Sequence, residues 1–335
     1  MTKRIVLATA SGVLVADGEG TDWEPISHRL TGRPGCVLLD GRREDRILVG
    51  CYEGGLHLSE DGGDHFEQIR NGSIRPESVT SLAVDPVNPD RLYAGTEPSQ
   101  LYRSDDGGES WSAIPGLDEV PSAARWSFPP RPDTHHVRWI EPDPNDPERL
   151  YLGIEAGALV VTPDGGETWI DRPNGSRIDN HTLATNPKAP GKVYSAAGDG
   201  YAESVDFGAS WVEHHEGLDH GYVWGLAVDP EDPDTVVISA ASGASNAHRE
   251  PGESYLYRQT GSTAWERLDG RGVPTGPGHR RAVLSAGQTS GEFFAATDDG
   301  IFQSTDAGQS WEELDIEVPG RLKGDLPRGL GVCSW

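Results

Sequence analysis

The residues best suited to chemistry are Arg, His, Trp and Tyr side chains that recur at one position before a repeated apolar strand pattern of the Leu-Ala-Val type. The residue just before each such strand is, in chain order, Gly35, Thr80, Arg138, His181, Trp224, Arg281 and Arg328. The residue two places earlier is Arg33, Ser78, His136, Asp179, Tyr222, His279 and Leu326. Repeats without a site would carry small residues there, as Thr80 and Ser78 do. The large polar residues therefore indicate a site.

The arginines at these positions predict a site for a small anionic ligand, such as an acidic sugar. Planar guanidinium groups present paired donors that suit carboxylate, phosphate or sulfate. Arginines around one axis repel each other unless an anion or acidic side chains lie among them. The ligand-binding residues we expect are Arg138, Arg281, Arg328, Arg33, Tyr222 and Trp224, with Trp224 stacked on a ligand ring. The alternative is that the arginines pair with local carboxylates and fill the channel.

Carboxylates accompany the arginines. Acidic residues stand at equivalent places in the predicted loops between second and third strands, namely Glu53, Glu97, Glu155, Asp199 and Asp298. Two carboxylates can act as acid and base, or as nucleophile and acid, in glycoside cleavage. Our catalytic candidates are Glu155, Asp179 and His181, in which His181 or Glu155 would move a proton. The same carboxylates can equally be counter-ions of the arginines.

A divalent metal is a competing interpretation of the same positions. His136, Asp179, His181 and His279 occupy matching places in different repeats, and side chains that converge across a ring can bind a metal without a local motif. The chain has none of the short ligand spacings typical of zinc sites. We therefore predict no cofactor, and keep this set of residues as the alternative.

The elements that position these residues follow from a second repeat. Five segments share the pattern Ser/Thr-x-Asp-x-Gly-x-x-aromatic, at residues 59–66, 104–111, 162–169, 204–211 and 304–311. Two degenerate copies of the pattern end at Trp23 and Trp265. The aromatic residues that close the seven copies therefore lie at 23, 66, 111, 169, 211, 265 and 311. A period in the low forties is that of one four-stranded propeller blade. The pattern predicts an all-β fold, a seven-bladed β-propeller over residues 1–335 as a single domain.

The two ends of the chain predict how the ring closes. Residues 3–9 resemble a second strand with no inner strand before it, and residues 328–332 resemble an inner strand with no partner after it. Together they complete one blade. Pairing the C-terminal inner strand with the N-terminal strands closes the ring and removes free sheet edges.

These five segments resemble the BNR/Asp-box repeats, and the resemblance covers nearly the whole chain. Proteins with this repeat include sialidases, xyloglucan-type glycosidases, sortilin-like receptor domains and photosystem II assembly factors of the Ycf48/HCF136 type. The resemblance implies a fold rather than one reaction. A literal sialidase is not expected, because the chain lacks the Phe/Tyr-Arg-Ile-Pro motif near its start and sialidases resemble six-bladed propellers. The boxes themselves are expected to be structural turns.

Composition excludes some partners. The net charge is 28 − 54 = −26, which opposes contact with nucleic acid or an anionic membrane. Lys3, Arg4 and the apolar run 5–16 resemble a short signal peptide, but the repeat accounts for the same residues as strands. We therefore expect an unprocessed, cytoplasmic protein with no nucleic-acid or membrane partner.

Two insertions are expected to cover one mouth of the ring, near residues 115–136 and 243–253. Functional loops gather on the face that carries insertions. The sequence thus favours a glycosidase-like hydrolase or lyase that binds a small anion. The alternatives are a non-catalytic scaffold or assembly factor, whose protein partner would contact the insertions, and a metal-dependent propeller enzyme.

Overall fold

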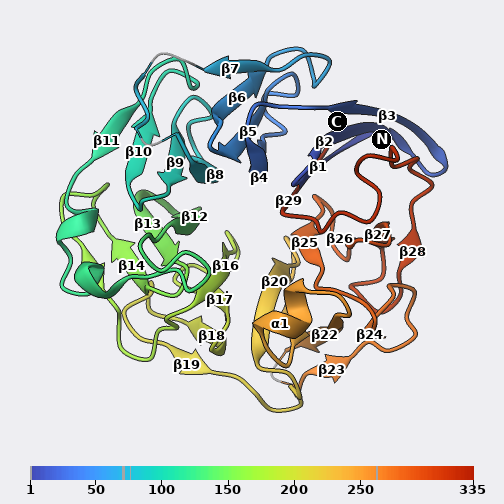
Figure 1. Ribbon diagram of the computed structural model, residues 1–335. Coiled ribbons are helices and arrows are strands. Elements are labelled where there is room, and N and C mark those ends of the chain that lie inside the picture. The colour runs from blue at the N-terminus through green and yellow to red at the C-terminus, as the bar shows by residue number, and fades with distance from the viewer. Residues whose placement is uncertain (1, 70–71, 76, 262) are drawn as a thin grey trace.

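The computed structural model describes residues 2–69, 72–75, 77–261 and 263–335, and arranges them as a ring of seven antiparallel sheets (Figure 1). Each sheet is a blade whose inner strand faces the ring axis. The prediction of an all-β, seven-bladed propeller is confirmed. The described helices are one short α-helix, α1 (Ala244–His248), and two 3-10 turns, η1 (Leu117–Glu119) and η2 (Ala123–Arg125). None of the described helices has the length and apolar character needed to span a membrane.

Each blade runs from an inner strand at the ring axis to an outer strand at the rim. Blade 1 contains β29 (Gly329–Ser334), β1 (Lys3–Thr9), β2 (Gly12–Glu19) and β3 (Asp22–His28). Blade 2 contains β4 (Arg33–Leu39), β5 (Ile47–Tyr52), β6 (Gly55–Ser59) and β7 (Glu67–Ile69). Blade 3 contains β8 (Val79–Val84), β9 (Leu92–Thr96), β10 (Leu101–Ser104) and β11 (Ser112–Ile114). Blade 4 contains β12 (Val137–Asp143), β13 (Asp146–Ile154), β14 (Ala158–Thr162) and β15 (Ile170–Asp171).

The remaining blades follow the same order. Blade 5 contains β16 (Asn180–Thr185), β17 (Val193–Ala197), β18 (Gly200–Ser204) and β19 (Val212–Glu213). Blade 6 contains β20 (Tyr222–Val228), β21 (Thr235–Ala241), β22 (Glu253–Thr260) and β23 (Glu266–Arg267), and β24 (Gly276–Pro277) adds to β22. Blade 7 contains β25 (Val283–Ala286), β26 (Phe293–Ala296), β27 (Ile301–Ser304) and β28 (Glu312–Glu313).

Blade 1 closes the ring with strands from both ends of the chain. Strand β29 pairs antiparallel with β1, in a register that places Leu330 opposite Leu7. The same β1 pairs with β2 on its other side. The predicted closure is therefore confirmed, and residues 3–16 form strands rather than a separate apolar segment. Pairing at this junction protects the sheets from edge-to-edge association.

The hydrophobic core lies between the blades. Seven clusters of buried apolar side chains each join strands of two neighbouring blades, one cluster at every interface of the described ring. Middle strands are buried on both faces, as in β21, where all seven residues are buried. Outer strands such as β11 are largely exposed. Burial of apolar surface therefore stabilises the ring mainly at the interfaces between blades.

The Asp-boxes are structural turns, as expected. In the box of blade 3, the Asp106 carboxylate accepts hydrogen bonds from the Ser104 hydroxyl at 2.7 Å and the Ser110 amide at 2.9 Å. The Trp111 indole donates to the Gly108 carbonyl and packs in the cluster between blades 2 and 3. The complete boxes of blades 4, 5 and 7 repeat the Ser/Thr–Asp–amide bonds. The box carboxylates thus accept hydrogen bonds from residues of their own turn.

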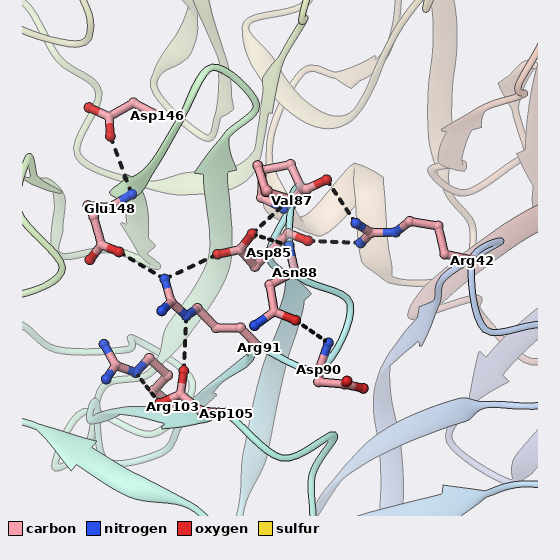
Figure 2. A network of polar contacts seen from close by, with 11 residues as sticks. Arg42, Asp85, Val87, Asn88, Asp90, Arg91, Arg103, Asp105, Asp146 and Glu148 are labelled. Atoms are coloured by element: carbon pink, nitrogen blue, oxygen red, sulfur yellow. Dashed lines mark hydrogen bonds and ion pairs between the residues drawn. The ribbon is translucent and has the colours of Figure 1, made fainter.

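Polar networks on the Asp-box face tie neighbouring blades together (Figure 2). The buried Asp85 carboxylate in blade 3 accepts the amide N–H groups of Val87 and Asn88 at 2.7 and 2.8 Å. Arg42 of blade 2 donates to the carbonyl oxygen of Asp85, and Arg91 reaches Glu148 of blade 4 at 2.9 Å. These carboxylates have protein donors, and the contacts link blades 2, 3 and 4.

Candidate ligand site at the mouth of the central channel

The residues that recur before each inner strand lie at β-bulges. In five blades, a bulge interrupts the pairing of the inner strand with the second strand. The interruptions lie between Pro34 and Cys36, Val79 and Ser81, Val137 and Trp139, Asn180 and Thr182, and Val223 and Leu226. The unpaired residues are Gly35, Thr80, Arg138, His181, and Trp224 with Gly225. A bulge bends the strand and redirects a side chain. The repeat position is thus the one at which the backbone can turn a side chain toward the axis.

The bulge side chains also bind the neighbouring blade. The Thr80 hydroxyl of blade 3 donates to the Val137 carbonyl of blade 4 at 2.8 Å. Nδ1 of His181 in blade 5 lies 2.7 Å from the Val223 carbonyl of blade 6. A carbonyl only accepts, so Nδ1 carries the hydrogen. His181 therefore makes the same contact between blades as Thr80, and its longer ring leaves Nε2 facing the site.

Three of the bulge residues, Gly35, Arg138 and Trp224, line a cavity of about 670 Å³, which we call the mouth cavity. A volume of this order suits a small organic ligand. A narrower space of about 60 Å³ continues along the axis, lined in part by Arg138, Trp224 and Arg328. The mouth cavity is lined by Arg33, Gly35, Tyr52, Phe128, Pro129, Pro130, Arg131, Arg138, Glu155, Ala156, Asp179, Tyr222, Trp224, Ala244, Ser245, His248, Arg249, Arg281, Leu326 and Arg328.

Arg281 is the most deeply buried cation of the mouth cavity, with 3 % of its surface exposed. Its guanidinium carbon lies 4.1 Å from the ring centroid of Trp224, and its Nη1 has no hydrogen-bond partner among the described residues. Burial and the neighbouring Arg138 charge lower the pKa of Arg281 to about 9. The group still carries its charge at neutral pH. It therefore stands in the cavity as a cation that no described carboxylate neutralises directly.

The other arginines divide into two groups. Arg33, Arg131 and Arg138 have carboxylate partners. Arg131 Nε donates to Glu97 at 2.9 Å, and Arg33 and Arg138 each lie 3.7 Å from a carboxylate, of Glu53 and Glu155 respectively. Within the described ranges, no carboxylate lies within 4.0 Å of the Arg281 or Arg328 guanidinium. Burial, together with the positive charge of Arg33, lowers the pKa of Arg328. Uncompensated positive charge thus collects on the side of the cavity formed by blades 1, 6 and 7.

Both predicted insertions line the mouth cavity. The first, between β11 and β12, supplies Phe128, Pro129, Pro130 and Arg131. The second, between β21 and β22, contains α1, whose Ala247 carbonyl accepts the Arg281 amide at 3.1 Å. His248 Nδ1 accepts a hydrogen bond from Arg281 Nε at 3.2 Å, and burial beside Arg281 lowers the pKa of His248 to about 2. The insertion therefore fixes Arg281 with a neutral acceptor and leaves its charge unbalanced.

Glu155, Asp179 and His181 form a compact group in the wall between blades 4 and 5, which we call the carboxylate–histidine cluster. One oxygen of each carboxylate and one ring nitrogen of His181 all lie within 4.8 Å of one another. His181 Nε2 is 3.7 Å from Asp179 Oδ1 and has no hydrogen-bond partner in the described structure. Asp179 Oδ1 accepts the amide N–H of Ala156 at 2.8 Å. Ala156 holds a left-handed φ of 50°, which turns its N–H toward Asp179.

The two carboxyl groups of this cluster differ in their electrostatics. Burial raises the pKa of Asp179. Burial also opposes charge on Glu155, but the hydrogen bond from His136 Nε2 at 2.8 Å and the surrounding positive charges prevail and lower its pKa to about 2. Burial lowers the pKa of His181, which keeps its ring neutral. Such divergent environments are typical of groups with distinct chemical roles.

The structure brings most of the predicted site residues together, with two differences. Arg33, Arg138, Arg281, Arg328, Tyr222, Trp224, Glu155 and Asp179 line the mouth cavity, and His136 and His181 lie directly behind Glu155 and Asp179. Trp224, expected to stack on a ligand ring, is 7 % exposed and lies against Arg281, Arg138 and His181 instead. It supports the arginines and has no open face for a ligand.

His279 lies outside the carboxylate–histidine cluster. Its Nδ1 is 2.8 Å from Asp299, because β24 pairs with β22 and draws the segment before Arg281 toward the second insertion. The set proposed as a metal alternative therefore does not assemble as such, and the group that does assemble is Glu155, Asp179 and His181. Comparison of the repeats also missed several cavity residues, among them Tyr52, Phe128, Arg131 and His248. The insertion residues have no counterpart in other repeats, and only their aromatic and basic composition marked them.

Comparison with known proteins supports the repeat family. The BNR/Asp-box repeat model matches residues 102–113. A probable oligoxyloglucan-reducing end-specific xyloglucanase of Neosartorya fischeri is 26 % identical over 290 residues, which are 69 % of this chain and 33 % of that protein. A xyloglucanase of Acetivibrio thermocellus is 26 % identical over 268 residues, covering 66 % of this chain and 30 % of that protein. The chain thus spans about a third of the length of these curated relatives.

Solved structures share the ring. The GH74 enzyme of Niastella koreensis superposes with a TM-score of 0.70 at 18 % identity, covering 93 % of this chain and 52 % of that chain. The structure described as YCF48 bound to D1 peptide superposes with a TM-score of 0.60 at 20 % identity, covering 88 % of this chain and 86 % of that chain. The chain thus contains a BNR/Asp-box repeat, and it shares the β-propeller fold of these structures.

Proposed function

We propose that this protein is a glycosidase-like hydrolase or lyase that binds a small anionic ligand, such as an acidic sugar, in the mouth cavity. The observation that carries the proposal is Arg281, a buried guanidinium stacked on Trp224 with no carboxylate within ion-pair distance among the described residues. A buried, unpaired charge is costly to the fold. An anionic ligand would remove that cost, with Arg138 and Arg328 as further donors.

The relatives support the hydrolytic part of the proposal. Several are xyloglucanases, at 24–26 % identity. Next to the arginines, Glu155 and Asp179 supply the two carboxyl groups that glycoside cleavage uses, and they face the same cavity. Xyloglucan is a neutral polymer, whereas this cavity has excess positive charge. We therefore infer a different, acidic substrate for this chain.

The proposal is tested by turnover. Purified protein is incubated with oligosaccharides containing uronic acids and with neutral xyloglucan oligosaccharides, and released reducing ends or unsaturated products are measured. We expect activity on an acidic substrate that falls by at least about tenfold in Arg281→Gln, since a hydrogen bond to a charged group contributes roughly 1.5–3 kcal/mol. The exposed Arg271→Gln is the matched control. Equal activity of Arg281→Gln, or cleavage of neutral substrates alone, contradicts the proposal.

A second candidate function is peptide binding without catalysis. It is favoured by the Ycf48 structure with a bound peptide, because that match covers most of both chains. The free carboxylate or acidic side chains of a peptide would meet the same arginines. Binding of an acidic peptide that requires Arg281, in a protein inactive toward every acidic oligosaccharide, would select this function.

A further inference from the structure

We propose that Glu155, Asp179 and His181 form a binding site for a divalent transition-metal cation, with Zn²⁺ as the best-matched ion, in the wall of the mouth cavity. The site lies in the same cavity as the proposed hydrolase site and shares Glu155 and Asp179 with it. Metal ligation and direct action in glycoside cleavage are alternative roles for these two carboxylates, and anion binding at Arg281 depends on neither. The test of the metal site needs no substrate, so failure of metal binding and failure of anion binding are separate results.

His181 is oriented as a metal ligand would be. The side chain is fully buried, and its Nδ1–H is held by the Val223 carbonyl at 2.7 Å. Metal-ligating histidines usually donate their other ring N–H to a carbonyl or carboxylate, which fixes the tautomer. The Nε2 lone pair is thereby aimed at the cluster and has no donor among the described residues. A buried acceptor without a donor is rare in proteins, and a cation would satisfy it.

The two carboxylates lie close to His181 Nε2. An acceptor nitrogen 3.7 Å from a carboxylate oxygen, with a second carboxylate within 4.8 Å, places three electron-rich atoms together. Ligands about 2.0–2.2 Å from a tetrahedral Zn²⁺ lie roughly 3.3–3.6 Å apart. The three atoms of the cluster lie within 4.8 Å of one another, so they would move closer together when an ion binds. One nitrogen with two carboxylate oxygens also suits Zn²⁺ or Mn²⁺ better than Ca²⁺ or Mg²⁺, which prefer oxygen alone.

Neighbouring groups hold both carboxylates in place. Asp179 Oδ1 accepts the Ala156 amide, and Glu155 Oε2 accepts His136 Nε2 at 2.8 Å. The other oxygen of Asp179 lies against Gly198, where an added Cβ would collide with it. Supporting bonds of this kind orient metal ligands. Three protein ligands with a side open to a cavity are the arrangement of a catalytic zinc site, whose fourth position takes water or substrate.

No described arginine lies close enough to the cluster to neutralise both of its carboxylates in place of a metal cation. Arg138 Nε is 3.7 Å from Glu155, and it is the closest guanidinium to the cluster among the ion pairs of the described residues. No arginine or lysine pairs with Asp179 within 4.0 Å in the same set. Two carboxylates and one divalent ion are neutral together, which leaves the arginines on the far side of the cavity free for an anion. The two sites are therefore electrostatically compatible.

The repeat supplies a variant that removes the ligand and keeps the fold. Thr80 bridges to the next blade through its hydroxyl at the position equivalent to His181. We therefore expect His181→Thr to retain the bond to Val223 and to lose the metal ligand. Asp179→Asn is the second variant. His279→Gln is the matched control, because His279 lies on the same face and pairs with Asp299.

The experiment is calorimetric titration of metal-stripped full-length protein with ZnCl₂, and separately with MnCl₂ and CaCl₂, with bound metal checked by elemental analysis. We expect one Zn²⁺ per chain, and a loss in His181→Thr and Asp179→Asn that exceeds the roughly 10–100-fold cost of losing a group that only supports a ligand. His279→Gln should bind as the wild type does. No stoichiometric uptake, unchanged affinity in both variants, or loss in His279→Gln would overturn the site. Uptake of Ca²⁺ in preference to Zn²⁺ would overturn the assignment of the ion.

Discussion

Arg281 lies over the indole of Trp224, with the guanidinium carbon 4.1 Å from the ring centroid, in a wall that provides no carboxylate for it among the described residues. The contact pairs a cation with an aromatic face, which partly compensates for lost hydration. The insertion helix α1 adds a neutral acceptor, His248. The fold thus places an unbalanced positive charge at one of its inner-strand positions, facing a cavity.

Because the charge of Arg281 is unpaired, we expect it to lower the stability of the ligand-free protein and to favour binding of an anion. We expect Arg281→Met, which keeps the apolar contact with Trp224 and removes the charge, to be as stable as the ligand-free wild type or up to about 2 kcal/mol more stable. The measurement is urea unfolding at low ionic strength. A loss of stability greater than about 2 kcal/mol would show that Arg281 is already neutralised within the protein.

The wild type and Arg281→Met can also be compared in the presence of an anionic ligand. An anion that binds the native state raises the unfolding midpoint by mass action. Glucuronate should raise the midpoint of the wild type and leave that of Arg281→Met unchanged. An equal rise in both proteins would place the anion elsewhere.

The proposed metal site predicts that a substitution at Gly198, which is not itself a metal ligand, weakens Zn²⁺ binding. Gly198→Ala directs a Cβ against Asp179 Oδ2, so Asp179 must move. We expect Zn²⁺ affinity to fall by roughly 10–100-fold, as for loss of a group that orients a metal ligand. Gly221→Ala is the control, because its Cβ meets nothing within 4 Å. Titration calorimetry compares the two, and equal affinities would argue against Asp179 as a ligand.

The Asp-boxes predict a stabilising substitution. Gly62, Gly107 and Gly165 follow the box aspartate with φ between 69° and 76°, whereas Ala307 adopts 61° in the equivalent place. The left-handed region costs a non-glycine residue roughly 1–2 kcal/mol, offset in part by the greater freedom of glycine when unfolded. We expect Ala307→Gly to stabilise the protein by about 0.5–1 kcal/mol in thermal unfolding. Gly107→Ala should destabilise it, and stabilisation by both changes would refute the reasoning.

The box aspartates also predict acid sensitivity. Hydrogen bonds from the Ser110 hydroxyl and amide lower the pKa of Asp106 to about 2. Because its folded pKa lies below the ordinary value of about 4, its stabilising contribution is complete above that value. The contribution is lost as pH falls toward 2. In Asp106→Asn the unfolding temperature should therefore be lower than that of the wild type near neutral pH, with a difference that narrows as the pH approaches the folded pKa. A constant difference would exclude this carboxylate as a titrating contributor.

The sequence predicted the ring because every blade repeats two local signals, the box and the apolar pair of inner strands. The closure by residues 3–9 and 328–332 followed from the same count, and strands β1 and β29 confirm it. The site residues that occupy a repeated position were predictable from the sequence. Arg138, His181 and Trp224 occupy the bulge position, which recurs in register with the strands.

The remaining parts of the site depend on segments without a repeat. His248 and Arg131 come from insertions whose paths no other blade reveals, and His279 was displaced by the short pairing of β24 with β22. Trp224 lines the mouth, as its place in the repeat predicts, but a ring flanked by Arg281 and His181 is covered by the protein itself. Contacts between different blades of this kind are not encoded in spacing along the chain.

The most direct test of the proposed anion site is calorimetric titration of the wild-type protein with glucuronate and with neutral glucose, repeated in Arg281→Gln and in the exposed control Arg271→Gln. The anion site predicts binding of glucuronate and not of glucose, with affinity reduced roughly tenfold to a hundredfold in Arg281→Gln and unchanged in Arg271→Gln. Equal binding of the two sugars, or an Arg281→Gln protein that binds glucuronate as the wild type does, would contradict it.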